Sequence, residues 1–417
     1  MAGAIDTLSM PSLRHIAPAG TPIPFPMLLG AAMDQLRGAD TGAALATAIR
    51  EHYGVRHCLT LSSGRAALTL IFRALKKLAD DPRRNEVIVP GYTCYSVAAS
   101  AVLAGLRLRI VDINPRTLSY DRALLEGVDC SRVLAVVSAN LYGLPNELDV
   151  IERFARSHGI YMVDDAAQAL HATFKGRYAG TFGDVGIYSF DKGKNITSLQ
   201  GGAIVTDDDA IAGALAEAID ELPEELPSTT AAAFLKLSAY TLLLRPWLYW
   251  IPAGIPALGL GRTVYTTDIP MHRSSIMATS LVLRLLANIE AITAARIQAA
   301  GRIETALSDI GSLVPIAPLP GSVPAYLRQP CLAVDVGRRD QIIAALTRTG
   351  IGATGSFPRA LGDLPEITAH ASVEGGILRG AREVAARIIT LPTLAYLQAG
   401  DVRRLVTALG TIPADEA

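Results

Sequence analysis

The chain has 417 residues, enough for two domains of ordinary size, and half of them are hydrophobic, so a large core can form. Its 38 Lys and Arg residues nearly balance 39 Asp and Glu residues, which leaves a formal charge of -1. Because a nucleic-acid-binding surface needs an excess of basic groups, this balance argues against nucleic acid as a partner. It is compatible with a local basic pocket for a phosphorylated small molecule.

The four cysteines are scattered and form no C-x-x-C pair. This spacing predicts neither a disulfide framework nor a metal site, and it is typical of a protein in the reducing cytoplasm. The first thirty residues contain no basic segment followed by an unbroken apolar one, because five prolines interrupt them. We therefore expect no signal peptide and a cytoplasmic protein.

From about Ala44 to Asp208, helix and strand patterns alternate. A helix is predicted over 65–78, where apolar residues recur at helical spacing. Short runs rich in β-branched residues predict strands at 87–89, 108–111, 133–137, 160–163, 185–188 and 203–205, with helices between several of them, as at 96–104 and 148–157. This alternation predicts an α/β fold with a mostly parallel sheet flanked by helices, in which ligands bind at the carboxyl ends of strands.

The second half of the chain has a different pattern. Residues 221–230 have the composition of a linker, and an apolar stretch follows at 231–261. A long helix is predicted from Ser274 to about Leu307. The remainder predicts a small α/β domain, with a strand at 332–336, a helix at 339–348 and a final helix at 401–409.

Two acidic residues stand at the end of a predicted strand, in Asp164-Asp165-Ala166-Ala167-Gln168. Because strand side chains alternate, one carboxylate is expected to point into a site and the other away from it. An acid in this position is suited to pair with a cationic ring nitrogen of a cofactor. A helix N-cap is the plainer interpretation, since Asp favours that position.

Two further motifs follow the same logic. Lys194 lies beside Gly193 just after a predicted strand, where its amine can approach a bound carbonyl and form a Schiff base, although a solvated turn explains the same residues. Ser63-Gly64 precedes a predicted helix, whose free N–H groups and dipole favour a phosphate, and Arg65 adds charge. An ordinary serine cap is the alternative there.

Together, the order and spacing of these motifs resemble the DegT/DnrJ/StrS family of pyridoxal-phosphate-dependent sugar aminotransferases. The matching stretches are 62–68, 86–90, 140–145, 164–168, 183–190, 194–195, 201–206, 350–352 and 391–392. The resemblance implies a type I aminotransferase fold and a homodimer with active sites at the subunit interface. The corresponding division is a large cofactor-binding domain at 22–225, an apolar insertion at 226–264, and a long helix with a small C-terminal domain at 265–417.

The resemblance also implies a role for individual residues. Lys194 is implied to be the catalytic residue that binds pyridoxal 5'-phosphate as a Schiff base and then moves a proton between the donor α-carbon and the cofactor. Asp165 is implied to pair with the pyridinium nitrogen, and Gln168 to lie near the ring. The cofactor phosphate is expected at Ser189, together with the backbone at Gly64 and Arg65.

Two departures from the family pattern concern the cofactor. Arg65 stands where the family usually has Thr, which changes the contact expected with the phosphate. The aromatic residue that the family stacks on the ring aligns with Cys94. Either Tyr95 or Tyr92 takes over this contact, or the thiol packs there.

Two other departures concern the partner subunit and the substrate. Of an Asn-x-Arg pair that reaches the partner's cofactor phosphate in the family, only Arg273 is present. Ser356 stands where the small domain of the family has a His, and we keep it, together with Tyr142, as a candidate substrate contact. The resemblance therefore supports the cofactor more strongly than the acceptor.

The apolar stretch 231–261 contains both tryptophans, Trp247 and Trp250, but only two charges. Its prolines interrupt any continuous helix, whereas a membrane-spanning helix needs about 20 apolar residues. Two interpretations stay open. One is a peripheral membrane contact with the aromatic rings at the level of the headgroups. The other is packing against the same domain or a dimer partner.

The leading functional hypothesis is an aminotransferase that moves an amino group from an amino acid, glutamate in most of the family, to a keto sugar. The acceptor is expected to be nucleotide-linked and to serve polysaccharide or glycoconjugate synthesis. One alternative acceptor is a lipid-linked or other hydrophobic ketone at the membrane. A different class of function, a non-catalytic regulator on the same fold, is the second alternative.

Overall fold

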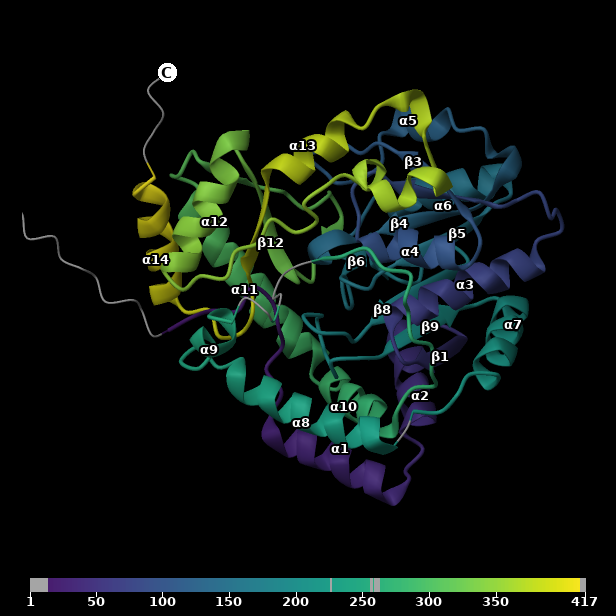
Figure 1. Ribbon diagram of the computed structural model, residues 1–417, viewed down its shortest axis with the longest axis horizontal. Coiled ribbons are helices and arrows are strands. Elements are labelled where there is room, and N and C mark those ends of the chain that lie inside the picture. The colour runs from purple at the N-terminus through teal and green to yellow at the C-terminus, as the bar shows by residue number, and fades with distance from the viewer. Residues whose placement is uncertain (1–13, 226, 256–257, 259–262, 413–417) are drawn as a thin grey trace, which may run out of the picture.

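The computed structural model describes residues 14–225, 227–255, 258 and 263–412. Two parts of the sequence discussed above lie outside these ranges. They are residues 1–13, where no signal peptide is expected, and part of the apolar stretch 231–261. The chain forms a large domain around an eight-stranded sheet and a smaller C-terminal domain (Figure 1).

The large sheet is mostly parallel, as the alternating pattern predicts. Its strands, in spatial order, are β1 (His57–Leu61), β9 (Gly202–Thr206), β8 (Val185–Ser189), β5 (Tyr161–Asp165), β4 (Val133–Ala139), β2 (Glu86–Pro90), β3 (Arg107–Val111) and β13 (Ala371–Val373). All pairs from β8 to β13 are parallel, whereas β9 is antiparallel to both of its neighbours. The carboxyl ends of β4, β5 and β8 therefore meet at one edge of the sheet.

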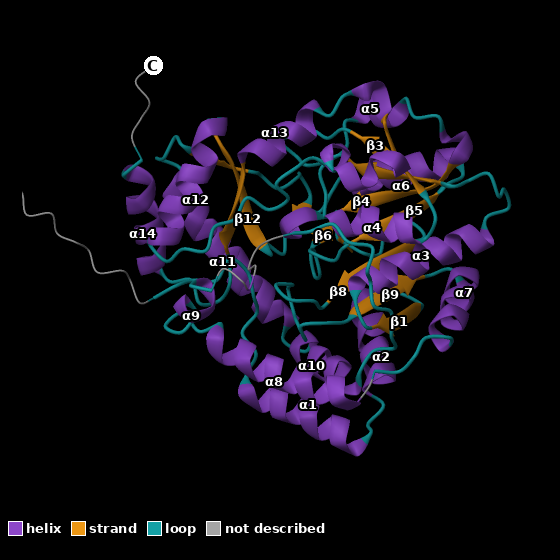
Figure 2. Ribbon diagram, viewed as in Figure 1, coloured by secondary structure: helices purple, strands orange, loops and turns teal. Residues whose placement is uncertain are grey.

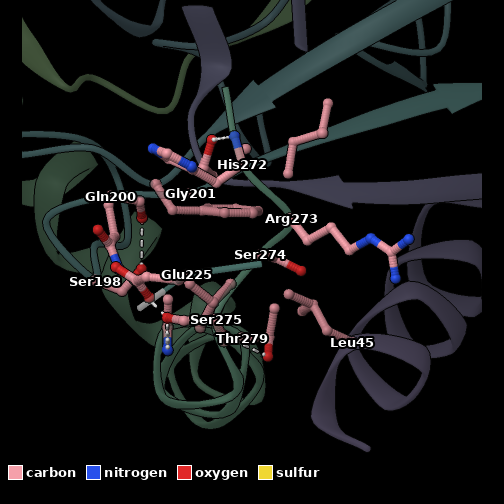
Figure 3. Close-up of a pocket in the computed structure, with 16 residues that line it drawn as sticks. Leu45, Ser198, Gln200, Gly201, Glu225, His272, Arg273, Ser274, Ser275 and Thr279 are labelled. Carbon is pink, nitrogen blue, oxygen red and sulfur yellow. Dashed lines mark hydrogen bonds between the residues drawn. The ribbon is translucent and has the colours of Figure 1, made fainter. Parts of the chain in front are cut away.

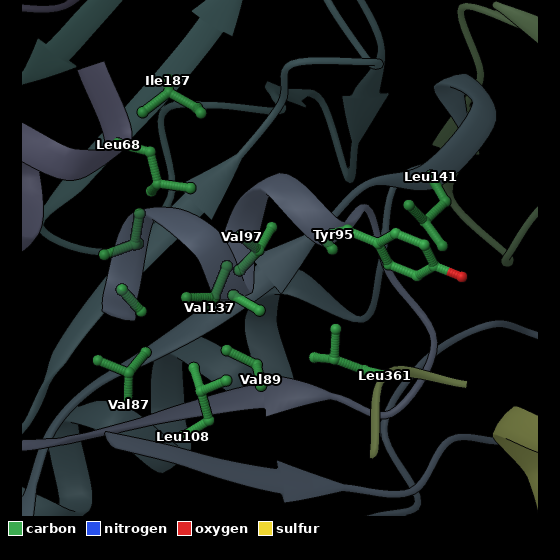
Figure 4. Close-up of a cluster of buried hydrophobic side chains, with 14 of the residues drawn as sticks. Leu68, Val87, Val89, Tyr95, Val97, Leu108, Val137, Leu141, Ile187 and Leu361 are labelled. Atoms are coloured by element: carbon green, nitrogen blue, oxygen red, sulfur yellow. The ribbon is translucent and has the colours of Figure 1, made fainter. Parts of the chain in front are cut away.

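Helices cover both faces of this sheet (Figure 2). Alternate strand residues face opposite cores: Val87 and Val89 pack in one cluster, and Ile88 packs in the other. The first cluster, part of which is drawn in Figure 4, includes residues of α3 (Gly64–Leu78), α4 (Tyr95–Leu103) and α7 (Asp209–Asp220). The second includes residues of α1 (Phe25–Arg37), α2 (Thr41–Tyr53), α5 (Arg122–Glu126), α6 (Leu148–His158) and α10 (Ile276–Leu286).

The small domain is built on a three-stranded antiparallel sheet with its own core. Its strands are β10 (Leu313–Pro315), β12 (Arg328–Ala333) and β14 (Ile388–Pro392), and its core includes residues of α12 (Arg339–Arg348) and α14 (Ala399–Gly410). Helix α13 (Arg379–Arg387) instead packs in the first cluster of the large domain. A third small sheet contains β6 (Thr173–Phe174), β7 (Arg177–Tyr178) and β11 (Ser322–Val323). Because β13 joins the large sheet, the C-terminal part of the chain contributes to both domains.

The prediction of a single long helix from Ser274 to Leu307 is wrong in one respect. This segment forms two helices, α10 and α11 (Ile289–Leu307), which meet at a bend of 65°. The side chain of Asn288 donates to the carbonyl of Arg284 at 3.1 Å and so binds the end of α10. The bend lets α10 pack in the large domain, while Ile303 of α11 packs in the core of the small domain.

The described residues of the apolar insertion include the helices α8 (Pro227–Leu243) and α9 (Trp250–Ala253). Helix α8 therefore begins inside the predicted linker 221–230. It lies beside α1 (Figure 1) and buries Leu237. Within the described ranges, no single helix is long and apolar enough to cross a membrane, whereas the bent pair α10 and α11 reaches that length and composition only when taken together.

Candidate active site

A cleft lies at the carboxyl ends of β5 and β8, opposite the start of α3. We call it the lysine cleft; it encloses about 570 Å³, part of which is open to solvent. Seven of the predicted site residues line it: Gly64, Arg65, Cys94, Asp165, Gln168, Ser189 and Lys194. They come from four separate segments of the chain, which the topology of the sheet brings to one place.

The two neighbouring acids at the end of β5 face different surroundings, as strand alternation predicts. Asp164 is fully buried, and its carboxylate accepts hydrogen bonds from Asn140 Nδ2 at 2.7 Å and from the backbone N–H groups of Gly180 at 2.6 Å and Phe182 at 3.2 Å. Burial raises the pKa of the Asp164 carboxyl to about 7 in spite of these bonds. Asp164 therefore fixes the loop around 180–182, whereas Asp165 lines the cleft.

The Asp165 carboxylate accepts a hydrogen bond from the backbone N–H of Ala167 at 2.9 Å. Burial raises the pKa of Asp165, and this bond and the positive charge of Lys194 oppose the rise. The backbone carbonyl of Asp165 accepts from Asn140 Nδ2 at 3.0 Å, which holds the end of β5 in place. The result is a fixed acid at the wall of the cleft, within the electrostatic reach of Lys194.

Lys194 lies in the loop that leaves β8, and the N-terminal segment holds this loop. Thr21 Oγ1 lies 3.0 Å from the Lys194 carbonyl oxygen and 2.7 Å from that of Asn195, and it accepts from Arg296 Nη2 at 3.0 Å. The backbone N–H of Thr21 donates to the hydroxyl of Tyr240 on α8 at 3.0 Å. The apolar insertion is thus connected to the lysine loop through one threonine, a link that the sequence pattern does not reveal.

The start of α3 forms a cradle beside Ser189. Ser63 caps the helix, since its hydroxyl accepts from the backbone N–H of Ala66 at 3.1 Å. The next backbone N–H groups, at Gly64 and Arg65, have no carbonyl partner within the helix and carry the positive end of its dipole. A Cβ on Gly64 would lie 2.8 Å from Ser189 Cβ, so glycine permits this close approach. The arrangement suits a phosphate group.

Gln168 and Tyr142 are joined to each other. The backbone N–H of Tyr142 donates to Gln168 Oε1 at 2.9 Å, which leaves the amide NH₂ of Gln168 toward the cleft that it lines. Tyr142 is fully buried, its hydroxyl lies 3.0 Å from that of Tyr92, and its ring stacks on Phe357 with centroids 6.3 Å apart. Tyr142 therefore supports the wall of the cleft from behind.

Of the candidates for the ring-stacking position, the structure brings only Cys94 to the cleft. Cys94 precedes α4 and lies 3.1 Å, Sγ to Oγ, from Ser96, which also lines the cleft. Tyr95 is buried with its hydroxyl between the backbone N–H and carbonyl of Arg359, at 3.0 and 3.2 Å. The Tyr92 hydroxyl donates to the carbonyl of Ser356. Both tyrosines are directed toward the small domain.

The cleft extends from Lys194 toward the small domain and the insertion. This extension is lined by Arg328, Ser356 and Phe357 of the small domain and by Tyr249 and Val264 of the insertion. The sequence indicates Ser356 through the resemblance, but Arg328 and Tyr249 are not predicted as site residues. The signal available in the sequence is a charged residue at the start of the run 328–333, in which only Arg328 and Gln329 are polar.

Arg273 lies apart from the lysine cleft. It lines a different pocket, between β1, β9 and α10, together with Gln200, Glu225 and His272 (Figure 3). In Figure 3 its side chain extends away from Gln200 and Glu225, and its Nη2 donates to the carbonyl of Asp220 at 2.5 Å. Within one chain, Arg273 is therefore not assembled with Lys194.

Solved structures share this architecture over nearly the whole chain. An aminotransferase from Helicobacter pylori involved in the biosynthesis of pseudoaminic acid matches with a TM-score of 0.76 and 18% identity, covering 95% of this chain and 98% of that one. A DegT DnrJ EryC1 StrS aminotransferase from Brucella abortus matches with a TM-score of 0.74 and 21% identity, covering 93% and 95%. The chain therefore has the type I aminotransferase fold.

Sequence comparison identifies the family. The profile of the DegT/DnrJ/EryC1/StrS aminotransferase family matches residues 32–220 and 272–410, and the chain belongs to this family. GDP-perosamine synthase from Caulobacter vibrioides is 37% identical over 165 residues, 40% of this chain and 43% of that protein. UDP-2-acetamido-2-deoxy-3-oxo-D-glucuronate aminotransferase from Pseudomonas aeruginosa is 24% identical over 87% of this chain and 88% of that protein. The match to the perosamine synthase thus spans less than half of that relative.

Proposed function

We propose that this protein is a pyridoxal-phosphate-dependent aminotransferase that moves an amino group from an amino acid to a keto sugar. The observation that carries the proposal is the meeting of Asp165, Lys194 and the start of α3 in one cleft. Each of the three has a plainer explanation alone. Their convergence from distant parts of the chain is explained by one ligand that has a cationic ring nitrogen, a reactive carbonyl and a phosphate.

The residues of the cleft fit this cofactor. Gly64 lacks the Cβ that would crowd Ser189, so the phosphate has both a hydroxyl donor and the backbone N–H groups at a helix start. Asp165 provides an acceptor for a protonated ring nitrogen. Lys194 provides the primary amine. When bound, pyridoxal phosphate supplies an electron sink next to the carbon that loses its proton.

The chain's own residues then hold and move the reacting groups. Lys194, on a loop fixed by Thr21, is placed to carry a proton to and from the substrate carbon beside its Nζ. The amide NH₂ of Gln168 is held toward the cleft by the bond from Tyr142 and can donate to an oxygen of the bound ring. Cys94 and Leu68 provide apolar packing surface for the ring.

For the acceptor, we propose a nucleotide-linked keto sugar used in polysaccharide or glycoconjugate synthesis, and glutamate as the donor. Support comes from the names of the relatives, which are a perosamine synthase and an aminotransferase of a UDP-linked oxo sugar. We further propose a cytoplasmic homodimer. In that assembly Arg273, which lies apart from the cleft of its own chain, reaches the partner's cofactor phosphate.

Purified protein mixed with pyridoxal phosphate tests the proposal. We expect a visible absorption band that changes when glutamate is added. We also expect a product in which an amino group replaces the keto group of the sugar, detected by mass spectrometry. Protein that stays colourless would contradict the proposal and favour a non-catalytic regulator on the same fold. A panel of keto sugars, each with and without the nucleotide, then identifies the acceptor.

A second proposal is a peripheral membrane contact through the insertion, which would suit a lipid-linked acceptor. Trp247 and Trp250 are exposed by 58% and 48%, and Leu235 and Leu242 on α8 are also exposed. Exposed apolar surface of this kind is typical of interaction sites. The insertion also lines the extended cleft through Tyr249, so a hydrophobic acceptor at a membrane surface would lie near the reacting groups.

Replacing both Trp247 and Trp250 with serine is expected to reduce binding to vesicles of anionic lipid roughly 10-fold or more, because the loss of each indole ring removes apolar area that would be buried in the membrane interface. Cosedimentation with vesicles measures this. Substitution is preferred to deletion of 233–258, because that deletion removes Tyr240 and its bond to Thr21. Equal vesicle binding by the variant and the wild type would contradict the membrane contact.

A further inference from the structure

Arg328 is a cation on the wall of the extended cleft, and it has no acidic partner among the described residues. It is the first residue of β12. Its Nη1 donates to the hydroxyls of Thr354 at 2.9 Å, Ser356 at 3.4 Å and Thr390 at 3.4 Å. In the part of the chain that the structure describes, no carboxylate forms an ion pair with it. Arg328 is half-buried. Partial burial without a counter-charge is unfavourable for a guanidinium.

The hydrogen bonds of Arg328 leave donors unused. A guanidinium has five N–H groups, and among the described residues only Nη1 has protein acceptors. Buried Arg296 differs, because both of its Nη atoms donate to backbone carbonyls, those of Leu327 and Gly20. Arg296 thus holds the backbone of the chain, whereas Arg328 is fixed on one side by three hydroxyls and keeps Nε and Nη2 for another partner.

The surroundings favour a negatively charged partner. Burial lowers the pKa of Arg328. Its ionisable neighbours are the hydroxyls of Tyr142, Tyr249 and Tyr92, which are uncharged near neutral pH, and the cationic guanidinium of Arg296. The same extension is lined by Lys192 and Lys194 and by one acid, Asp191, so positive charge is in excess there. An anion bound there would offset the charge of the guanidinium and meet further positive potential from the lysines.

We propose that Arg328 binds a carboxylate of the substrate whose amino or keto group reacts beside Lys194. The inference rests on the proposed function and adds the chemical group that orients the substrate. The planar fork of a guanidinium pairs with a carboxylate through two parallel hydrogen bonds. Such a carboxylate has two sources: the amino-acid donor, or an acidic keto sugar that occupies the cleft in the second half of the reaction.

The two half-reactions are measured separately on the cofactor-loaded wild type, Arg328→Gln and Arg328→Lys. If the α-carboxylate of the donor binds there, Arg328→Gln is expected to weaken the binding of glutamate about 10- to 100-fold. The binding of glutamate α-amide, which lacks that carboxylate and is already weaker, should not change. For an acceptor carboxylate, the same loss appears with an acidic keto sugar and not with its neutral counterpart. Either pattern supports the site and identifies its source. Arg328→Lys should keep part of the affinity, because it retains the charge without the fork.

A binding measurement gives a second readout that does not depend on turnover. Calorimetric titration with glutarate, a dicarboxylate without an amino group, should show about 10- to 100-fold weaker binding to Arg328→Gln than to wild type. Arg348→Gln, an exposed arginine on α12 of the same domain, is the matched control and should bind like wild type. Melting temperatures verify that each variant is folded, and Arg328→Lys replaces Arg328→Gln if the latter does not fold.

The inference is overturned if Arg328→Gln handles both glutamate and the acidic keto sugar like wild type, or if it loses substrates equally with and without a carboxylate. Unchanged glutarate binding together with a selective loss of the acidic keto sugar assigns the carboxylate to the acceptor. A wild-type protein that transfers no amino group from any donor would instead overturn the proposed function. Because the second result concerns the unaltered chain and the first a single side chain, the two failures are distinguishable.

Discussion

Replacing Lys194 with alanine is expected to abolish the visible absorption band of the cofactor-loaded protein and to lower kcat by at least roughly 10²- to 10⁴-fold. The amine that binds the cofactor carbonyl and carries the proton would be missing, whereas the hydrogen bond from the Thr21 hydroxyl to the Lys194 backbone carbonyl would remain. The loop should therefore keep its conformation. Absorption spectra after reconstitution and mass detection of the aminated product measure the two effects.

Lys192 provides the matched control, because it is an exposed lysine in the same loop. Lys192→Ala is expected to keep the absorption band. Added methylamine should restore part of the activity of Lys194→Ala, since a free amine can enter the space left by the side chain and move the proton. An absorption band that survives in Lys194→Ala but disappears in Lys192→Ala would show that the cofactor is attached to Lys192 and not to Lys194.

The position of the site could be predicted because its residues follow local patterns. Asp165 and Ser189 end buried strands, and Gly64 begins a helix, so each is recognised from its own neighbours in the sequence. In a parallel sheet, the carboxyl ends of neighbouring strands lie at the same edge. The convergence of these residues therefore follows once the strands are identified, and β5 and β8 are adjacent.

The direction of several side chains could not be predicted, because it depends on partners far away in the chain. Tyr95 turns from the cleft because its hydroxyl meets the backbone of Arg359. Arg273 extends toward the carbonyl of Asp220. The bend between α10 and α11 likewise reflects two separate cores, one in each domain, rather than a helix-breaking residue. Arg328 lines the cleft because the small domain packs beside Lys194 and Gln168 of the large one.

Replacing Asp165 with asparagine is expected to lower kcat/KM roughly 10²- to 10³-fold, because a neutral amide cannot stabilise the positive charge of a protonated ring nitrogen. The amide oxygen can still accept the hydrogen bond from Ala167, so the fold around β5 should be retained. Stopped-flow absorption with glutamate measures the loss in the first half-reaction, and an unchanged melting temperature verifies the fold.

The same substitution should remove a pH dependence. Burial raises the pKa of Asp165 above its usual range, and Lys194 only partly opposes this. Since the cationic ring nitrogen pairs with the carboxylate and not with the carboxylic acid, the affinity of the wild type for pyridoxal phosphate should fall as the pH decreases through this raised pKa. Asp165→Asn has no proton to gain there, so any pH dependence that remains comes from other groups.

Asp191→Asn, which changes a different acid of the cleft, is the control and should keep the wild-type profile of cofactor affinity against pH. Titrations of cofactor binding between about pH 8 and about pH 5 measure the difference, and matching profiles for wild type and Asp165→Asn would contradict the pairing of Asp165 with the ring.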